Sequence, residues 1–313
     1  MPETVWTWMT FGVVVSIMLA LDLGVFHRKS HVIKVREALI WSGVWIGISL
    51  AFNLWLYFDL GAEPALMFLT GYLIEKSLSV DNIFVFIMIF SYFSVHPKYQ
   101  HKILFWGILG ALFMRGFMIA MGVTLINRFH WIIYIFGAFL IYTGIRMMFH
   151  DQEDVHPDKN VVLRLLQKQR FFPVISTFRG DKFIIRRQGA WLITPLLVVL
   201  LIVETTDILF ALDSIPAILS ITTDPFIVFS SNIFAILGLR ALYFALAGIM
   251  QIFHYLHYGV SLILAFVGLK MLLSDVWDMP VSIALGVIAL VLLGSILLSI
   301  FHPKKKVADV QRM

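Results

Sequence analysis

The chain has 313 residues, of which 60% are hydrophobic and 14% are charged, and its formal net charge is +5. Because soluble domains use roughly 45–50% apolar residues, this composition, with a mean hydropathy of +0.90, predicts a polytopic membrane protein. The absence of cysteine excludes disulfides, thiolate metal sites and thiol catalysis. The basic charge does not call for a nucleic-acid partner, since basic loops in membrane proteins report topology.

Nine apolar runs are long enough to cross a bilayer, which takes about 20 residues per helix. They cover residues 6–26, 38–58, 66–94, 103–126, 130–149, 192–219, 226–250, 257–274 and 279–301. The predicted fold class is therefore all-α, a membrane helix bundle of about nine transmembrane helices. The N-terminus lacks the basic segment of a cleavable signal peptide, so we expect the first run to remain in the mature protein.

Basic residues gather in the loops that nine spans would place on one side of the membrane. They are Arg28, Lys29, Lys34 and Arg36 in the first loop, Lys98 and Lys102 in the third, eight residues between His150 and Ala190, and Lys304, Lys305, Lys306 and Arg312 in the tail. The positive-inside rule then predicts an external N-terminus and a cytoplasmic C-terminus. In the long fifth loop, the stretch VVLRLLQKQR (161–170) predicts a short helix lying on the membrane surface.

Three short segments recur in the same order about 125 residues later. VDNIFVF (80–86) resembles TDILFAL (206–212), ILGALFMRG (108–116) resembles FAILGLRAL (234–242), and FLIYTGIRMM (139–148) resembles AFVGLKMLL (265–273). Each copy contains three spans, and an odd number inverts the second copy, as in many transporters. The predicted organisation is a two-span hairpin (1–65), a first repeat (66–149), a basic cytoplasmic loop (150–191), a second repeat (192–275), and a last span with a basic tail (276–313).

The span that leads each repeat carries acidic residues at membrane depth, where charge is costly and indicates a functional site. GYLIEKSLSVDNIFVFIMIF contains Glu75, Asp81 and Asn82, and LLIVETTDILFALDSIPAIL contains Glu204, Asp207 and Asp213. On a helix, Glu75 and Asn82 share a face, and Glu204 is adjacent to Asp207. We expect these residues to meet near the repeat interface. Pro216 predicts a kink or break that frees a backbone carbonyl as a further ligand.

Fewer basic residues lie at the same depth. They are Lys76, Arg115 and Arg240, so the five carboxylates would leave two negative charges if all groups were ionised. One divalent cation would neutralise them, as would two protons or two monovalent cations, and a buried carboxylate can also be protonated. Asp22 in the first span is a further candidate, and Asn232 is a neutral oxygen donor. The alternative interpretation is an ion-pair network that only holds the helices together.

The ligand types indicate a hard cation. Oxygen ligands suit Mg²⁺, Ca²⁺ and Mn²⁺, whereas imidazole and thiolate suit Zn²⁺ and copper. The ten histidines lie almost entirely in loops or at span ends, and none joins the acidic clusters in sequence. From the residues alone, the choice among Mg²⁺, Ca²⁺ and Mn²⁺ stays open.

Over essentially all its spans the chain resembles the TerC family of bacterial integral membrane proteins, in particular its Alx-like members. The resemblance lies in GYLIEKSLSVDNIFVF, VETTDILFALDSIPAI and TTDPFIVFSSNIFAILGLRALYF, with ALDL in the first span and YIFGAFLIYTG in the fifth. It implies a fold like that of the LysE-type transporters and a bacterial inner-membrane location. It also implies Mn²⁺ export, an association with tellurium resistance, and metal ligands at the acidic positions named above.

The predicted function is export of a divalent metal ion, Mn²⁺, from the cytoplasm through a mid-membrane carboxylate site, with proton antiport as the drive. The metal ligands are Glu75, Asp81, Asn82, Glu204, Asp207 and Asp213, supported by Lys76, Arg115, Asn232, Arg240, Pro216 and Asp22. No enzymatic activity and no permanently bound cofactor are expected, and the partners are the metal ion and the lipid bilayer. The sequence contains no P-loop motif for ATP.

Three alternatives remain open. The first is a Ca²⁺ or H⁺ transporter of the same build. The second is an intramembrane aspartyl hydrolase, which also uses paired aspartates, although the GxGD pattern of such enzymes is missing. The third is a non-transporting membrane scaffold in tellurite or envelope stress that binds partners through its basic loop.

Overall fold

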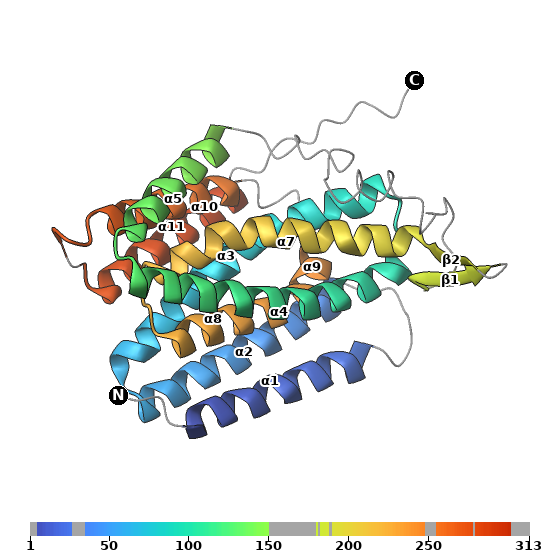
Figure 1. Cartoon of the computed structure of the whole chain (residues 1–313), viewed down its shortest axis with the longest axis horizontal. Helices are drawn as coiled ribbons and strands as arrows, with labels where there is room; N and C mark the ends of the chain where they lie inside the picture. The colour runs from blue at the N-terminus through green and yellow to red at the C-terminus, as the bar shows by residue number, and fades with distance from the viewer. Residues whose placement is uncertain are drawn as a thin grey trace.

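The computed structural model describes residues 5–26, 35–149, 180, 182–187, 190–247, 255–277 and 279–301. Within them the chain is a bundle of long helices with one small hairpin (Figure 1). The helices are α1 (Val5–Phe26), α2 (Val35–Asp59), α3 (Ala62–Tyr92), α4 (Pro97–Arg128), α5 (Ile132–Phe149), α7 (Pro195–Leu219), α8 (Pro225–Leu237), α9 (Leu239–Ala247), α10 (Leu256–Leu272) and α11 (Val281–Phe301).

These helices coincide with the predicted spans and support a multi-pass membrane protein. Long apolar stretches capable of crossing a bilayer are found in α2, α4, α5, α7, the α8–α9 pair and α11, and shorter ones in Val5–Leu21 and Leu256–Leu272. Helix α3 has 31 residues but carries Glu75, Lys76 and Asp81. Large apolar side chains cover the outside of the bundle, with Phe113 82% and Leu290 72% exposed, as contact with lipid requires.

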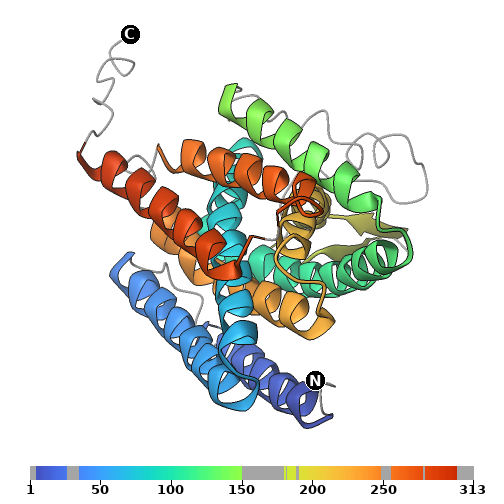
Figure 2. The same ribbon diagram turned by 90° about the vertical axis from the view of Figure 1, so that its left-hand side faces the viewer.

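Helix α3 runs through the middle of the bundle, between the α1–α2 pair and the group of α5, α10 and α11 (Figure 2). It packs on α2, α7, α8 and α11, while α4 packs on α7 and α8. Aromatic residues fill the contact of α2 with α8, where the rings of Phe52 and Phe234 stack with centroids 4.5 Å apart. This packing places α3, α4, α7 and α8 around a common interior.

Helices α5 and α10 approach each other unusually closely along small residues. A Cβ atom on Gly268 would lie 2.6 Å from the carbonyl oxygen of Gly137, and one on Gly144 would lie 2.7 Å from that of Ser261. Both contacts are with backbone, so a larger side chain would force the helices apart. Small residues at helix contacts are the usual way in which membrane helices gain van der Waals packing.

The predicted break at Pro216 does not occur. Helix α7 continues through Pro216 to Leu219, although the proline ring leaves one backbone carbonyl without its helical hydrogen bond. An interruption is found instead at Gly238, between α8 and α9. One turn before it, the carbonyl of Ala235 accepts a hydrogen bond from Lys76 Nζ at 3.1 Å. A Cβ atom on Gly238 would lie 2.9 Å from the same nitrogen, so glycine makes room for the lysine.

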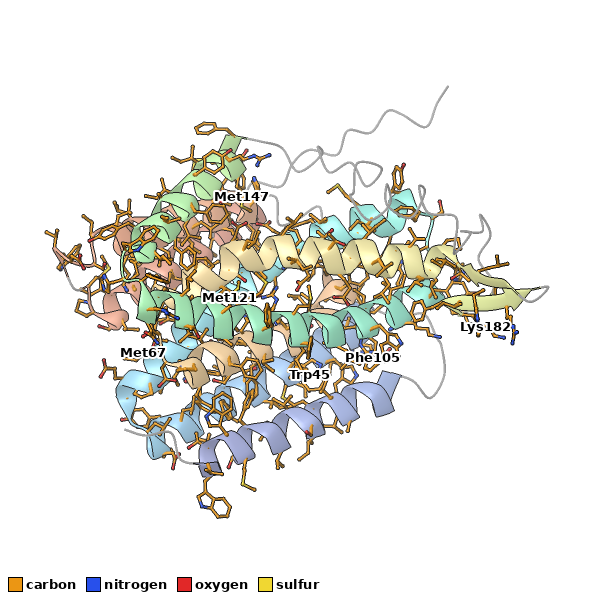
Figure 3. The ribbon with its side chains drawn as sticks, viewed as in Figure 1. Trp45, Met67, Phe105, Met121, Met147 and Lys182 are labelled. Atoms are coloured by element: carbon orange, nitrogen blue, oxygen red, sulfur yellow. The ribbon has the colours of Figure 1, made fainter. Side chains whose placement is uncertain are left out.

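A two-stranded hairpin precedes α7 and was not predicted. Strand β1 (Ile184–Arg187) pairs antiparallel with β2 (Ala190–Ile193), and Thr194 joins it to α7 by donating to the carbonyl of Lys182 at 2.7 Å. Lys182 lies at this end of the molecule and Met67 at the opposite end (Figure 3). The predicted surface helix over 161–170 lies outside the described residues.

Candidate cation site

Two of the predicted acidic residues meet inside the bundle. Glu75 of α3 is 0% exposed and Asp207 of α7 is 5% exposed. Arg115 of α4 lies between them and is 1% exposed. The three residues come from helices that the sequence separates by up to 132 positions, and the packing of α4 on α7 and of α3 on α7 brings them together.

The guanidinium of Arg115 is surrounded by oxygen atoms. Its Nε and Nη2 donate to the two carboxylate oxygens of Asp207 at 3.1 and 3.0 Å, the forked geometry that arginine forms with carboxylates. Its Nη1 pairs with Glu75 Oε1 and lies 3.3 Å from both Ser214 Oγ and Asn232 Oδ1. One cationic group is thus held by four residues of α3, α7 and α8.

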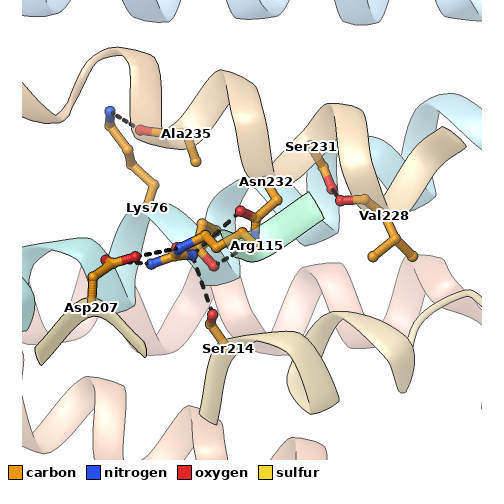
Figure 4. Close-up of polar contacts among 9 residues, drawn as sticks. Lys76, Arg115, Asp207, Ser214, Val228, Ser231, Asn232 and Ala235 are labelled. Atoms are coloured by element: carbon orange, nitrogen blue, oxygen red, sulfur yellow. Dashed lines mark hydrogen bonds and ion pairs between the residues drawn. The ribbon is translucent and has the colours of Figure 1, made fainter. Parts of the chain in front are cut away.

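Asn232 and Ser214 complete this arrangement (Figure 4). The amide nitrogen of Asn232 donates to Glu75 Oε2 at 3.0 Å, so the same side chain orients the carboxylate and accepts from the guanidinium. Ser214 lies seven residues after Asp207, and this spacing places both on one face of α7. The spacing of Asp207 and Ser214 on α7 equals that of Glu75 and Asn82 on α3.

The charges of the site explain why it is so fully paired. Two carboxylates and one guanidinium carry a net charge of −1 when all are ionised, and all three groups are buried. Buried ions are tolerated only when they are paired and hydrogen-bonded. Carboxylate, amide and hydroxyl oxygens arranged around one positive charge are also the donor types that hard divalent cations use.

The other predicted ligands lie at different places around the bundle. Asp81 and Asn82 are buried on α3, with Asn82 two turns from Glu75 on the same face. The carboxylate of Glu204 is half-buried and lies directly against the Cα of Gly110 in α4. Asp213 faces α5, where it interacts with Thr143 and Arg146.

The five carboxylates therefore do not form one group in this conformation. Among the described residues, no three side chains of Asp, Glu or His lie close enough to hold a single metal ion. The reason is helical phase, since Asp213 follows Asp207 by six residues and Asp81 follows Glu75 by six, about 120° away on each helix.

The predicted supporting residues are also distributed. Lys76 points to α8 and binds the Ala235 carbonyl. Arg240 is fully buried at the start of α9. Asp22 belongs to α1, but its side chain lies outside what the structure describes.

A small cavity adjoins the site. Its volume is about 10 Å³, and Asp207 and Arg240 line it together with apolar side chains such as Phe86, Ile108 and Val203. This volume holds about one water molecule. The space beside Asp207 is thus too small for a hydrated metal ion in this conformation.

Comparison with known proteins places the chain among integral membrane proteins. A family model described as "Integral membrane protein TerC family" matches residues 60–307. The "Uncharacterized membrane protein STKORF319" of Myxococcus xanthus is 53% identical over 95% of this chain and 92% of its own length. The "Putative membrane-bound redox modulator Alx" of Escherichia coli K12 is 48% identical over 90% of both chains. No solved structure matches.

Proposed function

Because this chain belongs to the TerC family of integral membrane proteins, we propose that it is a transporter that exports a divalent metal ion from the cytoplasm, the ion being Mn²⁺. The observation that carries the proposal is the ring of buried oxygens from Glu75, Asp207, Ser214 and Asn232, which already holds a positive charge. A buried cation site between helices of a membrane bundle suits transport better than a purely structural role.

The packing supports an inverted repeat of three spans, with α3, α4 and α5 equivalent to α7, α8–α9 and α10. In this scheme the contact of α3 with α8 is equivalent to the contact of α7 with α4, and both are present. The equivalent helices α3 and α7 also contact each other, as do α5 and α10. With an offset of 124 residues, Gly137 corresponds to Ser261 and Gly144 corresponds to Gly268. The contact between Gly137 and Gly268 is therefore equivalent to the contact between Ser261 and Gly144, and the structure contains both. The cation site then lies between the two repeats, as in other transporters of this kind.

The repeat also assigns a partner to Asp81. Asp81 corresponds to Asp207 and Arg240 corresponds to Arg115 in the aligned segments. Because Arg115 binds Asp207, we infer that Arg240 pairs with Asp81 in the other half. Asp81, Asn82, Glu204 and Asp213 stay predicted ligands, and we assign them to other points on the path of the ion.

The choice of Mn²⁺ rests on the family resemblance, because the donor types suit Mg²⁺ and Ca²⁺ equally. The name of the Escherichia coli relative refers to redox modulation. This chain has no cysteine, so a comparable role here would follow from control of a redox-active metal. Proton antiport, an inner-membrane location, a cytoplasmic C-terminus and a link to tellurium resistance belong to the same proposal.

Mn²⁺ uptake into inverted membrane vesicles tests the proposal. We expect uptake with the wild type and its loss in Asp207→Asn. Asp224→Asn is the matched control, because Asp224 caps α8 outside the site and asparagine is an equally good helix cap. Full uptake by Asp207→Asn would refute the site, and preferential uptake of Ca²⁺ in competition would replace the proposed ion.

A further inference from the structure

The guanidinium of Arg115 takes the position that a transported ion would need. It contacts five oxygen atoms, namely Glu75 Oε1, both carboxylate oxygens of Asp207, Ser214 Oγ and Asn232 Oδ1. Hard divalent ions bind at least six oxygens at about 2.0–2.6 Å. The same oxygens cannot serve the guanidinium and a metal ion at once.

We propose that Arg115 is a tethered cation that competes with the transported ion: it leaves the oxygens of Glu75 and Asp207 when the ion binds and returns to expel it at release. This inference rests on the proposed function. An arginine stays protonated at any physiological pH, so the site cannot be emptied by deprotonating it. The small volume beside Asp207 leaves no room for a hydrated ion while the guanidinium remains in place.

Glu204 provides a place for the displaced guanidinium. Its half-buried carboxylate makes no hydrogen bond or ion pair within the described part of the chain, and it lies against the Cα of Gly110. Gly110 is five residues before Arg115 on α4, and Glu204 is one turn before Asp207 on α7. If the Arg115 side chain moved along the α4–α7 contact, its guanidinium would leave the carboxylate of Asp207 and pair with that of Glu204. The guanidinium would then keep a carboxylate partner in both positions.

The competition predicts opposite effects on binding and transport. If the Arg115 guanidinium has left the site in about one wild-type molecule in ten or fewer, removing it should tighten Mn²⁺ binding at least about tenfold. Arg115→Gln should therefore bind Mn²⁺ more tightly than the wild type and transport it more slowly, because nothing displaces the bound ion. Glu204→Gln should weaken binding in the wild type but have no effect when Arg115 is already glutamine.

The test measures Mn²⁺ binding to the purified full-length protein by the electron paramagnetic resonance signal of the free ion, and Mn²⁺ uptake into vesicles. Arg128→Gln is the control, since it removes the same charge from the end of the same helix. Arg115→Lys carries the test if Arg115→Gln does not fold. Because an ammonium cannot make the forked contact with Asp207, it should show a smaller change in the same directions.

Tighter binding with slower uptake in the Arg115 variants supports the proposal. Binding equal to or weaker than that of the wild type, while the wild type and Arg128→Gln still bind and transport Mn²⁺, overturns the role of Arg115 and leaves the proposed function intact. An effect of Glu204→Gln that persists in the Arg115→Gln background overturns the role assigned to Glu204. Absence of Mn²⁺ binding and uptake in the wild type itself overturns the proposed function and this inference together.

Discussion

Among the single neutralisations in the candidate cation site, Arg115→Gln should destabilise the protein most when metal is absent. It leaves Glu75 and Asp207 as two buried carboxylates without the positive charge that now lies between them. Removal of one partner from a buried ion pair costs about 3–5 kcal/mol, because the remaining charge is uncompensated. Glu75→Gln and Asp207→Asn instead leave one carboxylate with one guanidinium. Their cost should be near that of a hydrogen bond to a charged group, about 1.5–3 kcal/mol.

Thermal unfolding of the purified variants in detergent with a metal chelator measures this difference. The expected order of unfolding temperature is wild type, then the two carboxylate variants, then Arg115→Gln. Addition of Mn²⁺ should raise the value for Arg115→Gln more than for the wild type, because binding stabilises the folded state. An Arg115→Gln variant as stable in chelator as Glu75→Gln would refute the charge balance derived from these contacts.

Further predictions concern glycines at helix contacts and the site asparagine. Gly110→Ala should displace the Glu204 carboxylate that lies against its Cα and so lower Mn²⁺ uptake. Gly107→Ala is the control, because its Cβ would lie 3.4 Å from Val203 and uptake should not change. Equal uptake by the two variants would remove Glu204 from the mechanism. Gly268→Val should lower the free energy of unfolding by about 1–3 kcal/mol, because it overpacks the contact of α5 with α10. Thermal unfolding measures this effect, and Gly286→Val is the control because nothing lies within 4 Å of its Cβ. Asn232→Ala should lower Mn²⁺ affinity by removing an oxygen and freeing Glu75, and unchanged binding would exclude Asn232 as a ligand.

Much of the fold could be predicted because lipid imposes a simple rule on sequence. A spanning helix must satisfy its backbone internally and present apolar side chains for about 20 residues, and the predicted spans agree with the helices of the structure. The same rule made the acidic segments of α3 and α7 conspicuous. The hairpin at 184–193 escaped prediction because it is short and lies in a polar loop, where no periodic pattern was expected.

Local signals at proline and glycine were less informative. Pro216 was expected to kink or break α7, and the helix continues through it to Leu219. The interruption at Gly238 lies beside Lys76, which reaches across from α3 to bind the Ala235 carbonyl. A contact between helices 159 positions apart leaves no local trace in either segment.

The sequence by itself determined that this is a membrane helix bundle and that its costly charges lie in α3, α4, α7 and α9, and it predicted that they mark a site for a hard cation. Only the tertiary structure decided which of those charges meet. Helical phase and the packing of α4 and α3 against α7 bring Glu75, Asp207 and Arg115 together and turn Asp213 toward α5. A count of charges gives a net value, but the proposed function depends on which oxygens share one positive group, and that is set by how the helices pack.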